Sequence, residues 1–114
     1  MDHSMENLKL AVILRTGRMA LGWNQEQFAE RLGLSKAVIS KCESLDSAPK
    51  GELIMKAVSL FQEYGIEMNL LGKDDLKISF GELVFEELSR SLQDAKTQKR
   101  KKAKPKEALK ADND

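Results

Sequence analysis

The sequence has only one cysteine, Cys42, and one histidine, His3. One thiol cannot form a disulfide within the chain, and one thiol with one imidazole cannot build a metal site, so we expect no bound metal. No apolar run approaches the 18 residues of a membrane span, and the N-terminus lacks the basic and then apolar pattern of a signal peptide. We therefore expect a cytoplasmic protein that does not associate with a membrane.

Patterns that indicate catalysis are also missing. The sequence contains no nucleophile beside a base, no glycine-rich loop that would cradle phosphates, and no set of metal ligands. A chain of 114 residues, 41% of them hydrophobic, has room for one small domain with appendages. We expect neither an enzyme nor a cofactor.

Charge is distributed unevenly along the chain, although the net charge is only +1. Residues 1–50 hold 7 Lys and Arg against 6 Asp and Glu, residues 51–95 hold 4 against 9, and residues 96–114 hold 8 against 3. The chain is thus nearly neutral, then acidic, then basic. This segregation indicates separate roles for the three segments.

Apolar residues at helical spacing predict a mainly α domain over residues 6–65. Gly17 lies inside the first helix and costs about 1 kcal/mol relative to alanine unless something packs close to its backbone. Asn24 and Ser35 are good N-caps, and Gly33 favours the left-handed conformation that ends a helix. The apolar stripe of the first helix is Leu10, Ala11, Leu14 and Leu21. The four expected helices cover residues 6–21, 25–32, 36–44 and about 49–64.

The third of these helices has two distinct faces at 100° per residue. One face is small, polar and cationic, and the other is apolar and can meet Phe28, Ala29 and Leu32 in a core. A short helix with such an outward face fits the major groove of DNA, which is about 12 Å wide. The polar face consists of Lys36, Ala37, Ser40, Lys41 and Ser44. The apolar face consists of Val38, Ile39 and Cys42.

The period changes at Ile66. Apolar residues alternate in residues 66–70 and 76–80, which predicts a β-hairpin, and helical spacing returns over residues 82–95. Because an isolated hairpin is marginal in water, we expect residues 66–95 to form a unit for dimerisation or partner binding. Residues 96–114 are predicted to be a basic, disordered tail. The apolar hairpin residues proposed as the partner surface are Ile66, Met68, Leu70, Leu76, Ile78 and Phe80.

The spacing of residues 25–43 resembles the helix-turn-helix of the lambda-repressor/Cro (XRE-like) family. The resemblance covers about residues 8–64 and implies a lambda-repressor-like domain of four to five helices. Within the family, Leu21–Gln25, the lack of glycine after Glu43 and a strand from Ile66 look most like HipB-type antitoxins. A second strand and a long C-terminal extension depart from that subfamily. The matching residues are Gln25, Phe28, Ala29, Leu32, Gly33, Leu34, Ser35, Ile39, Ser40 and Glu43.

The resemblance also implies roles for individual residues. Arg18 and Glu43 match a structural ion pair between the first helix and the end of the third. Gln25 and Ser35 could act only as helix caps, and Lys36 and Lys41 could be ordinary solvated lysines, so alternatives to DNA contact stay open. The candidates for base readout are Lys36, Ala37, Ser40 and Lys41. The candidates for phosphate contact are Asn24, Gln25, Ser35 and Ser44.

These features predict a sequence-specific, dimeric DNA-binding transcriptional regulator, most simply a repressor, whose partner is double-stranded DNA. An alternative is an antitoxin, which would also bind a toxin protein through residues 66–95. A third hypothesis is a mobile-element protein that uses the same fold to grip another regulator. The basic run over residues 96–106 could aid solubility or could bind DNA non-specifically in a salt-sensitive way.

Overall fold

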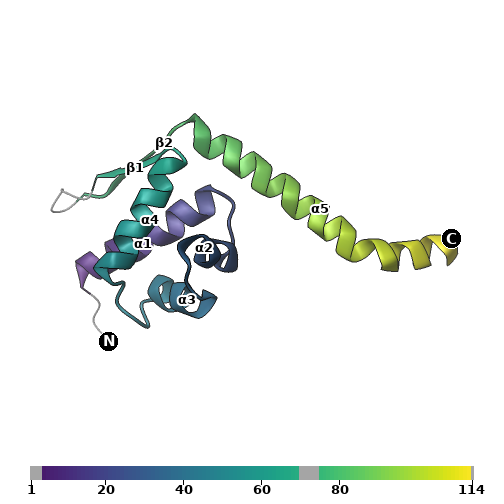
Figure 1. Ribbon diagram of the computed structural model, residues 1–114, viewed down its shortest axis with the longest axis horizontal. Coiled ribbons are helices and arrows are strands. Elements are labelled where there is room, and N and C mark those ends of the chain that lie inside the picture. The colour runs from purple at the N-terminus through teal and green to yellow at the C-terminus, as the bar shows by residue number, and fades with distance from the viewer. Residues whose placement is uncertain (1–3, 70–74, 114) are drawn as a thin grey trace.

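The computed structural model describes residues 4–69 and 75–113, with side chains as far as Lys99. This part of the chain contains five helices and one two-stranded sheet, and the fifth helix runs outward from the other elements (Figure 1). The architecture confirms the predicted mainly α fold with a C-terminal hairpin and helix. The elements are α1 (Met5–Ala20), α2 (Gln25–Leu32), α3 (Lys36–Ser44), α4 (Gly51–Glu63), β1 (Ile66–Asn69), β2 (Lys77–Phe80) and α5 (Glu82–Asn113).

Local side chains fix the starts of the first three helices. Ser4 Oγ accepts a hydrogen bond from the Asn7 amide at 3.1 Å, and Ser35 Oγ accepts one from the Val38 amide at 3.3 Å. Amides in the first turn of a helix have no partner within the helix, so these hydroxyls stabilise the helix ends. The bounds of α2 and α3 coincide with the prediction, and α1 differs by one residue at each end.

One hydrophobic core joins all seven elements. Phe28 and Phe61 stack at its centre, with ring centroids 5.3 Å apart. Gly17 faces the Phe61 ring so closely that a Cβ would overlap it, which supplies the packing reason for a glycine inside α1. Ile13 is fully buried although the predicted stripe omitted it, and Leu10 is only half-buried. The largest fully buried side chains are Ile13, Leu14, Leu21, Phe28, Ile39, Phe61, Ile66 and Val84.

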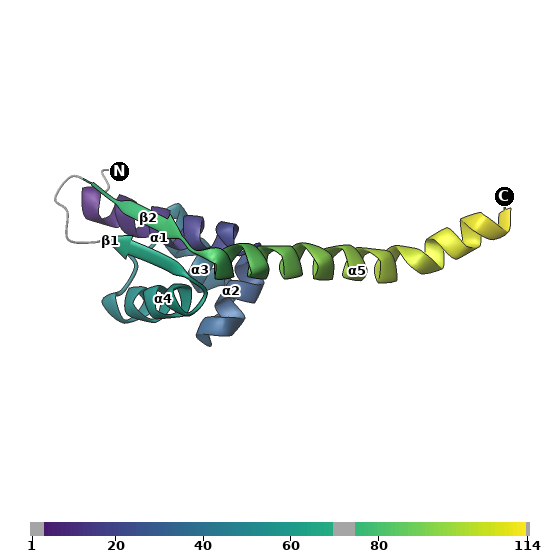
Figure 2. The ribbon, with the colours of Figure 1, turned by 90° about the horizontal axis from the view of Figure 1, so that it is seen from above.

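The hairpin has the predicted antiparallel pairing, with Ile66 opposite Phe80 and Met68 opposite Ile78. Seen from above, it lies across α1 and α4 (Figure 2). Ile66 is fully buried in the core of its own chain, and Met68, Leu76 and Ile78 pack against the same core.

Ile66 therefore cannot contact a partner, against the prediction, because it is fully buried in the core of its own chain. Met68, Leu76 and Ile78 are half-buried against the same core, which gives the ribbon part of the apolar surface it needs, and partner contact by these three residues stays a prediction. Phe80 keeps 41% of its surface exposed, and Leu70 lies outside the described residues.

The start of α5 belongs to the same core as the helix-turn-helix. Val84 is buried beside Ile66, so the division expected at residue 65 does not separate two cores. Gly65 accepts a backbone hydrogen bond from Gly81 at 2.8 Å, which ties the end of the hairpin to the end of α4. The predicted dimerisation unit is thus physically continuous with the DNA-binding domain.

Beyond its first turns, α5 leaves the body of the molecule (Figures 1 and 2). It continues to Asn113, where the sequence-based expectation was a disordered tail from residue 96. Alanine, lysine and glutamate are good helix formers, so an anchored helix can extend through this segment. The ribbon bends towards its C-terminal end (Figure 1), and α5 includes Pro105, which has no N–H to donate. No helix in the described ranges has both the length and the apolar character to cross a membrane.

Candidate nucleic-acid interface

Local interactions fix the start of α2, its end and the start of α3. Asn24 Oδ1 accepts from the Gln27 amide at 2.7 Å, and Gln27 Oε1 accepts from the Asn24 amide at 2.8 Å, which forms a capping box. Gly33 ends α2 with φ of 71°, a left-handed conformation that costs glycine little. Ser35 then caps α3. These interactions fix where the two short helices begin and where α2 ends.

The outward face of α3 is the one predicted from the sequence. Lys36, Ala37 and Lys41 are exposed and Ser40 is half-buried, so these four side chains form one continuous polar and cationic strip. On the opposite side, Ile39, Cys42 and Glu43 are buried.

Val38 departs from the prediction that it lies in the core. It is 39% exposed and lines a hollow of about 440 Å³ with Leu34 and Leu53. The hollow opens where the chain passes from α3 to α4, so Val38 has no helix packed over it. Helical spacing alone could not reveal this, because the position of the following loop decides which edge of α3 is covered.

Arg18 and Glu43 form the ion pair that the family resemblance implies. Arg18 Nε donates to Glu43 Oε2 at 2.8 Å and Arg18 Nη2 donates to Glu43 Oε1 at 3.0 Å, a two-bond geometry. Arg18 Nη1 also donates to the Trp23 carbonyl at 2.9 Å, and Gln25 Nε2 donates to Glu43 Oε1 at 3.2 Å. The end of α3 is thus bonded to α1 and to α2, and Arg18 also joins α1 to the turn before α2.

A cleft of about 330 Å³ lies where the amino ends of α2 and α3 meet. Helix amino ends carry partial positive charge and free N–H groups, and Lys36 adds a cation, so these groups favour an anion such as a phosphate, whereas Arg18 is already paired with Glu43. Glu26 also lines the cleft and opposes an anion there. The lining residues are Arg18, Asn24, Gln25, Glu26 and Lys36.

The structure brings only part of the predicted phosphate set together. Asn24 and Gln25 share the cleft, although the Asn24 side chain is engaged in the capping box and Gln25 holds Glu43. Ser35 stands at the start of α3 as its cap. Ser44 lies at the far end of α3, where its hydroxyl donates to Asp46 Oδ2 at 3.0 Å. Phosphate contact by each of these side chains stays a prediction.

A buried polar group that the sequence did not lead us to expect joins α5 to α2. Trp23 Nε1 donates to Glu87 Oε2 at 2.8 Å, and both residues are buried. Arg31 Nη2 lies 3.7 Å from Glu87 Oε2, and its guanidinium stacks 4.3 Å from the Trp23 ring centroid. Arg90 Nη1 lies 3.3 Å from Glu87 Oε1, at an angle that makes an ion pair without a hydrogen bond. Arg31 Nη1 donates to Tyr64 Oη at 2.9 Å.

A signal for this group was present in the sequence. Glu87 occupies a core position of α5, at the helical spacing set by Val84 and Ser91, so an acid stands where an apolar residue is expected. Such a carboxylate needs a buried donor or a cation. Trp23, interpreted from sequence only as packing before the Asn24 cap, is that donor. A second tie is the Ser91 hydroxyl, which donates to the Leu21 carbonyl at 2.8 Å.

Cys42 behaves as the core residue that the sequence indicated. Its side chain is buried, and burial, with a smaller contribution from the Glu43 carboxylate, raises the pKa of the thiol. A raised pKa keeps the thiol protonated and unreactive at neutral pH. Within the described part of the chain, no three His, Cys, Asp or Glu side chains come together as a metal site.

Comparison with known proteins agrees with this geometry. Residues 14–67 match the family model described as Helix-turn-helix, which is the XRE, lambda-repressor-like type, and this segment of the chain belongs to that family. The match spans α2 and α3 and the packing elements around them. Neither the curated proteins nor the solved structures contain a significant match. The helix-turn-helix over residues 14–67 supports a DNA-binding transcription regulator of the XRE type.

Proposed function

We propose that the protein is a dimeric, sequence-specific regulator, most simply a repressor, that reads an operator with the outward face of α3. The observation that carries this proposal is the exposed strip of Lys36, Ala37, Ser40 and Lys41 on a helix whose other side is anchored by Glu43. In the major groove, a lysine can donate to guanine O6 or N7, and an alanine methyl can contact the thymine methyl.

Phosphate contacts would orient that helix on the duplex. The cleft at the amino ends of α2 and α3 supplies helix N–H groups and the Lys36 cation. A neighbouring groove is lined by Asn24 and Gln27 at the start of α2 and by residues of α5 from Ser91 to Lys99. The basic segment of α5 therefore begins beside the proposed phosphate site. A DNA backbone bound there would pass next to that segment.

A single helix of this kind contacts about half of an operator. Two copies related by a two-fold axis, with their α3 helices roughly 34 Å apart, would read two half-sites one helical turn apart. Repression would follow if the occupied operator overlaps a promoter. The dimer is therefore part of this proposal.

The test begins by selecting preferred sequences from a random duplex library with the full chain. Lys41→Ala is expected to weaken binding to the selected site by about 1–3 kcal/mol and to relax preference at one base position. Lys77→Ala is the matched control, because Lys77 is an exposed lysine on β2, far from α3 in the chain. Failure of the full chain to select any sequence, or equal losses in the two variants, would contradict the proposed reading helix.

A further inference from the structure

Two exposed apolar surfaces of the described chain have no role in the interface above. Ten large hydrophobic side chains are substantially exposed in the described part of the chain, and eight of them lie on just two parts of the fold. Four belong to α1 and four to the segment formed by β2 and the start of α5. The first group is Met5, Leu8, Val12 and Met19. The second group is Phe80, Leu83, Phe85 and Leu92.

The α1 group forms a narrow stripe. Met5, Leu8, Val12 and Met19 follow the 3-4-7 spacing of a helix-packing seam, and at 100° per residue they fall within an arc of about 60°. Val12 is 44% exposed and Met19 63% exposed. The stripe is on the side of α1 opposite Leu14 and Gly17, which face the core. Seven residues separate Met5 from Val12 and Val12 from Met19, so the stripe runs the length of the helix.

Two members of the second group, Phe85 and Leu92, lie on the same side of the molecule as this stripe, whereas Leu83 lies on the α4 side of α5. Leu88 packs against Gly22 just after α1, whereas Leu83 packs against Gly65 just after α4, and these contacts mark the two sides of α5. Phe85 and Leu92 are within about 60° of Leu88 around the helix and are therefore on the α1 side. Figure 2 shows α1 and α4 on opposite sides of the hairpin from which α5 begins.

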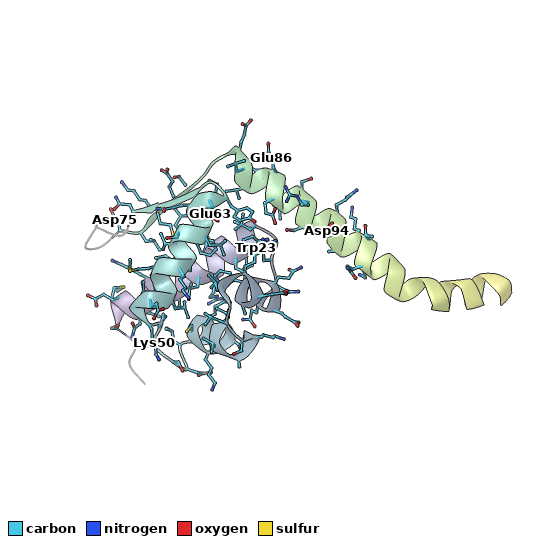
Figure 3. The ribbon with its side chains drawn as sticks, in the orientation of Figure 1. Trp23, Lys50, Glu63, Asp75, Glu86 and Asp94 are labelled. Atoms are coloured by element: carbon cyan, nitrogen blue, oxygen red, sulfur yellow. The ribbon has the colours of Figure 1, made fainter. Side chains whose placement is uncertain are left out.

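The two surfaces have opposite charge. The residues of α1 include three cations and one acid, and the first fourteen residues of α5 include four acids and one cation. Arg15 is exposed at the edge of the α1 stripe, and Glu82 and Glu86 are exposed beside Phe85. Figure 3 places Glu86 on the first turns of α5, above the body of the domain. The acids thus accompany one apolar surface and the exposed arginine the other.

From this geometry we infer that the occupant of these surfaces is a second copy of the chain, with α1 of each copy packed on the start of α5 of the other. A two-fold axis makes both contacts at once, because each copy presents both halves of the interface. Each contact joins an apolar stripe to an apolar ridge and a cationic edge to an anionic one. This inference names the surface of the dimer in the proposed function. It differs from the hairpin face predicted from the sequence, whose Ile66 is buried in the core of the same chain.

The arrangement also leaves the reading helix available. Neither α1 nor the start of α5 contributes to the outward strip of α3, and the α1 stripe points away from the core that α1 shares with α3. In a dimer formed only by contact between two α1 helices, the Arg15 side chains of the two copies would lie along the same edge of the contact and repel each other. The reciprocal contact of α1 with α5 avoids this repulsion between like charges.

The first experiment measures the dimer dissociation constant of the full chain by sedimentation equilibrium. Val12→Glu and Phe85→Glu each place an acid in the contact and are expected to weaken the dimer by at least about tenfold, since each substitution acts twice across the two-fold axis. Met55→Glu is the matched control, because Met55 is 72% exposed on α4 and belongs to neither apolar group. Circular dichroism checks that all three variants keep the fold, which is expected because the altered side chains are exposed.

A second experiment uses reciprocal charge reversal. Arg15→Glu alone and Glu82→Lys with Glu86→Lys alone should each weaken self-association, and an equimolar mixture should form a mixed dimer in which both contacts pair opposite charges again. A mixture that associates no better than its components would overturn the arrangement. A wild-type chain that stays monomeric at high micromolar concentration would also overturn it and would leave the two surfaces to a different partner.

Failure of the dimer inference and failure of the proposed function give different results. Lys41→Ala should remain dimeric while losing operator affinity, and Val12→Glu should retain weak binding to a duplex with a single half-site while losing dimerisation. A wild-type dimer that selects no DNA sequence would contradict the function but not the interface. Sequence selection by a dimer insensitive to Val12→Glu and Phe85→Glu would contradict only the interface.

Discussion

The helices α3 and α5 are held in the molecule by different means. Both ends of α3 are held by hydrogen bonds. Ser35 caps its start, and Glu43 near its end accepts hydrogen bonds from Arg18 and Gln25. By contrast, the contacts of α5 among the side chains described as far as Lys99 lie in its first turns, at Val84, the Trp23–Glu87 pair and the Ser91 hydroxyl, and the helix then leaves the body (Figure 1).

This difference indicates how the two helices serve function. A reading helix must hold base-contacting side chains at a fixed distance and angle, so it is fixed at both ends. In the proposed function, the basic part of α5 needs only to be close to DNA phosphates, whose attraction is weakly dependent on direction. A helix anchored at one end satisfies that requirement. Substitutions that alter one helix and leave the other unchanged test this contrast.

Arg18→Ala should give the largest effect because it attacks the support of α3. The Glu43 carboxylate, 5% exposed, would lose both charge-assisted bonds and keep only Gln25 as a donor. We expect a loss on the order of 3 kcal/mol in the free energy of unfolding, measured by urea titration. Arg18→Lys should lose less, since it keeps the charge without the two-bond geometry. Lys56→Ala, an exposed control on α4, should change stability by no more than about 0.5 kcal/mol.

Glu87→Ala should detach α5 without disturbing α3. Trp23 Nε1 would be left buried without its acceptor, and we expect a loss of about 1–3 kcal/mol on urea unfolding. Because Trp23 is the only tryptophan, its fluorescence reports the site directly, and water entering should shift the emission to longer wavelength. Glu87→Gln retains an acceptor and should lose less. An unchanged emission spectrum in Glu87→Ala would show that the pair does not hold α5 in place.

Removal of residues 95–114 should change DNA binding more than stability. The segment carries eight cations and three acids, and it begins beside the proposed phosphate site at α2. The slope of log affinity against log salt concentration is negative. We expect its magnitude to decrease by about 0.9 for each phosphate that the shortened chain no longer neutralises, with sequence preference retained. Fluorescence anisotropy over a salt series measures the slope. Equal slopes for the full and shortened chains would remove the segment from the interface.

The smallest effect concerns Cys42 in α3. Since burial raises the pKa of the folded thiol, the unfolded chain releases its proton first as pH rises, and stability falls only in the alkaline range above the ordinary thiol pKa. Below that range the thiol contributes no pH dependence. We expect the folded protein to react with a thiol reagent at pH 8 at least about tenfold more slowly than the urea-unfolded chain. Rapid labelling of the folded protein would contradict the burial of this side chain.

Most of the helix-turn-helix could be predicted because its signals are local. Asn24, Gly33 and Ser35 act on residues within four positions of themselves, so their effects can be inferred without knowing the rest of the fold. The bounds of α2 and α3 were accordingly correct. The exposed strip on α3 also followed from helical spacing. Base and phosphate contacts by these residues remain predictions.

The predictions that fell short concern residues whose packing depends on segments distant in the sequence. Ile66 was expected to face another protein, but it is buried in the core of its own chain. Val38 was expected in the core, but the path of the chain after α3 leaves it open. A periodic pattern identifies an apolar face, and only the packed fold identifies what covers it.

The sequence by itself determined where the short helices begin and end and which face of α3 is polar, because capping and helical periodicity act within a few residues. The tertiary structure decided the direction of α5 and the anchoring of α3. Those depend on contacts between residues 64 positions apart, Trp23 and Glu87, and 25 positions apart, Arg18 and Glu43. Such pairs form only when the core brings distant helices together, since no local rule specifies which donor a buried carboxylate will meet.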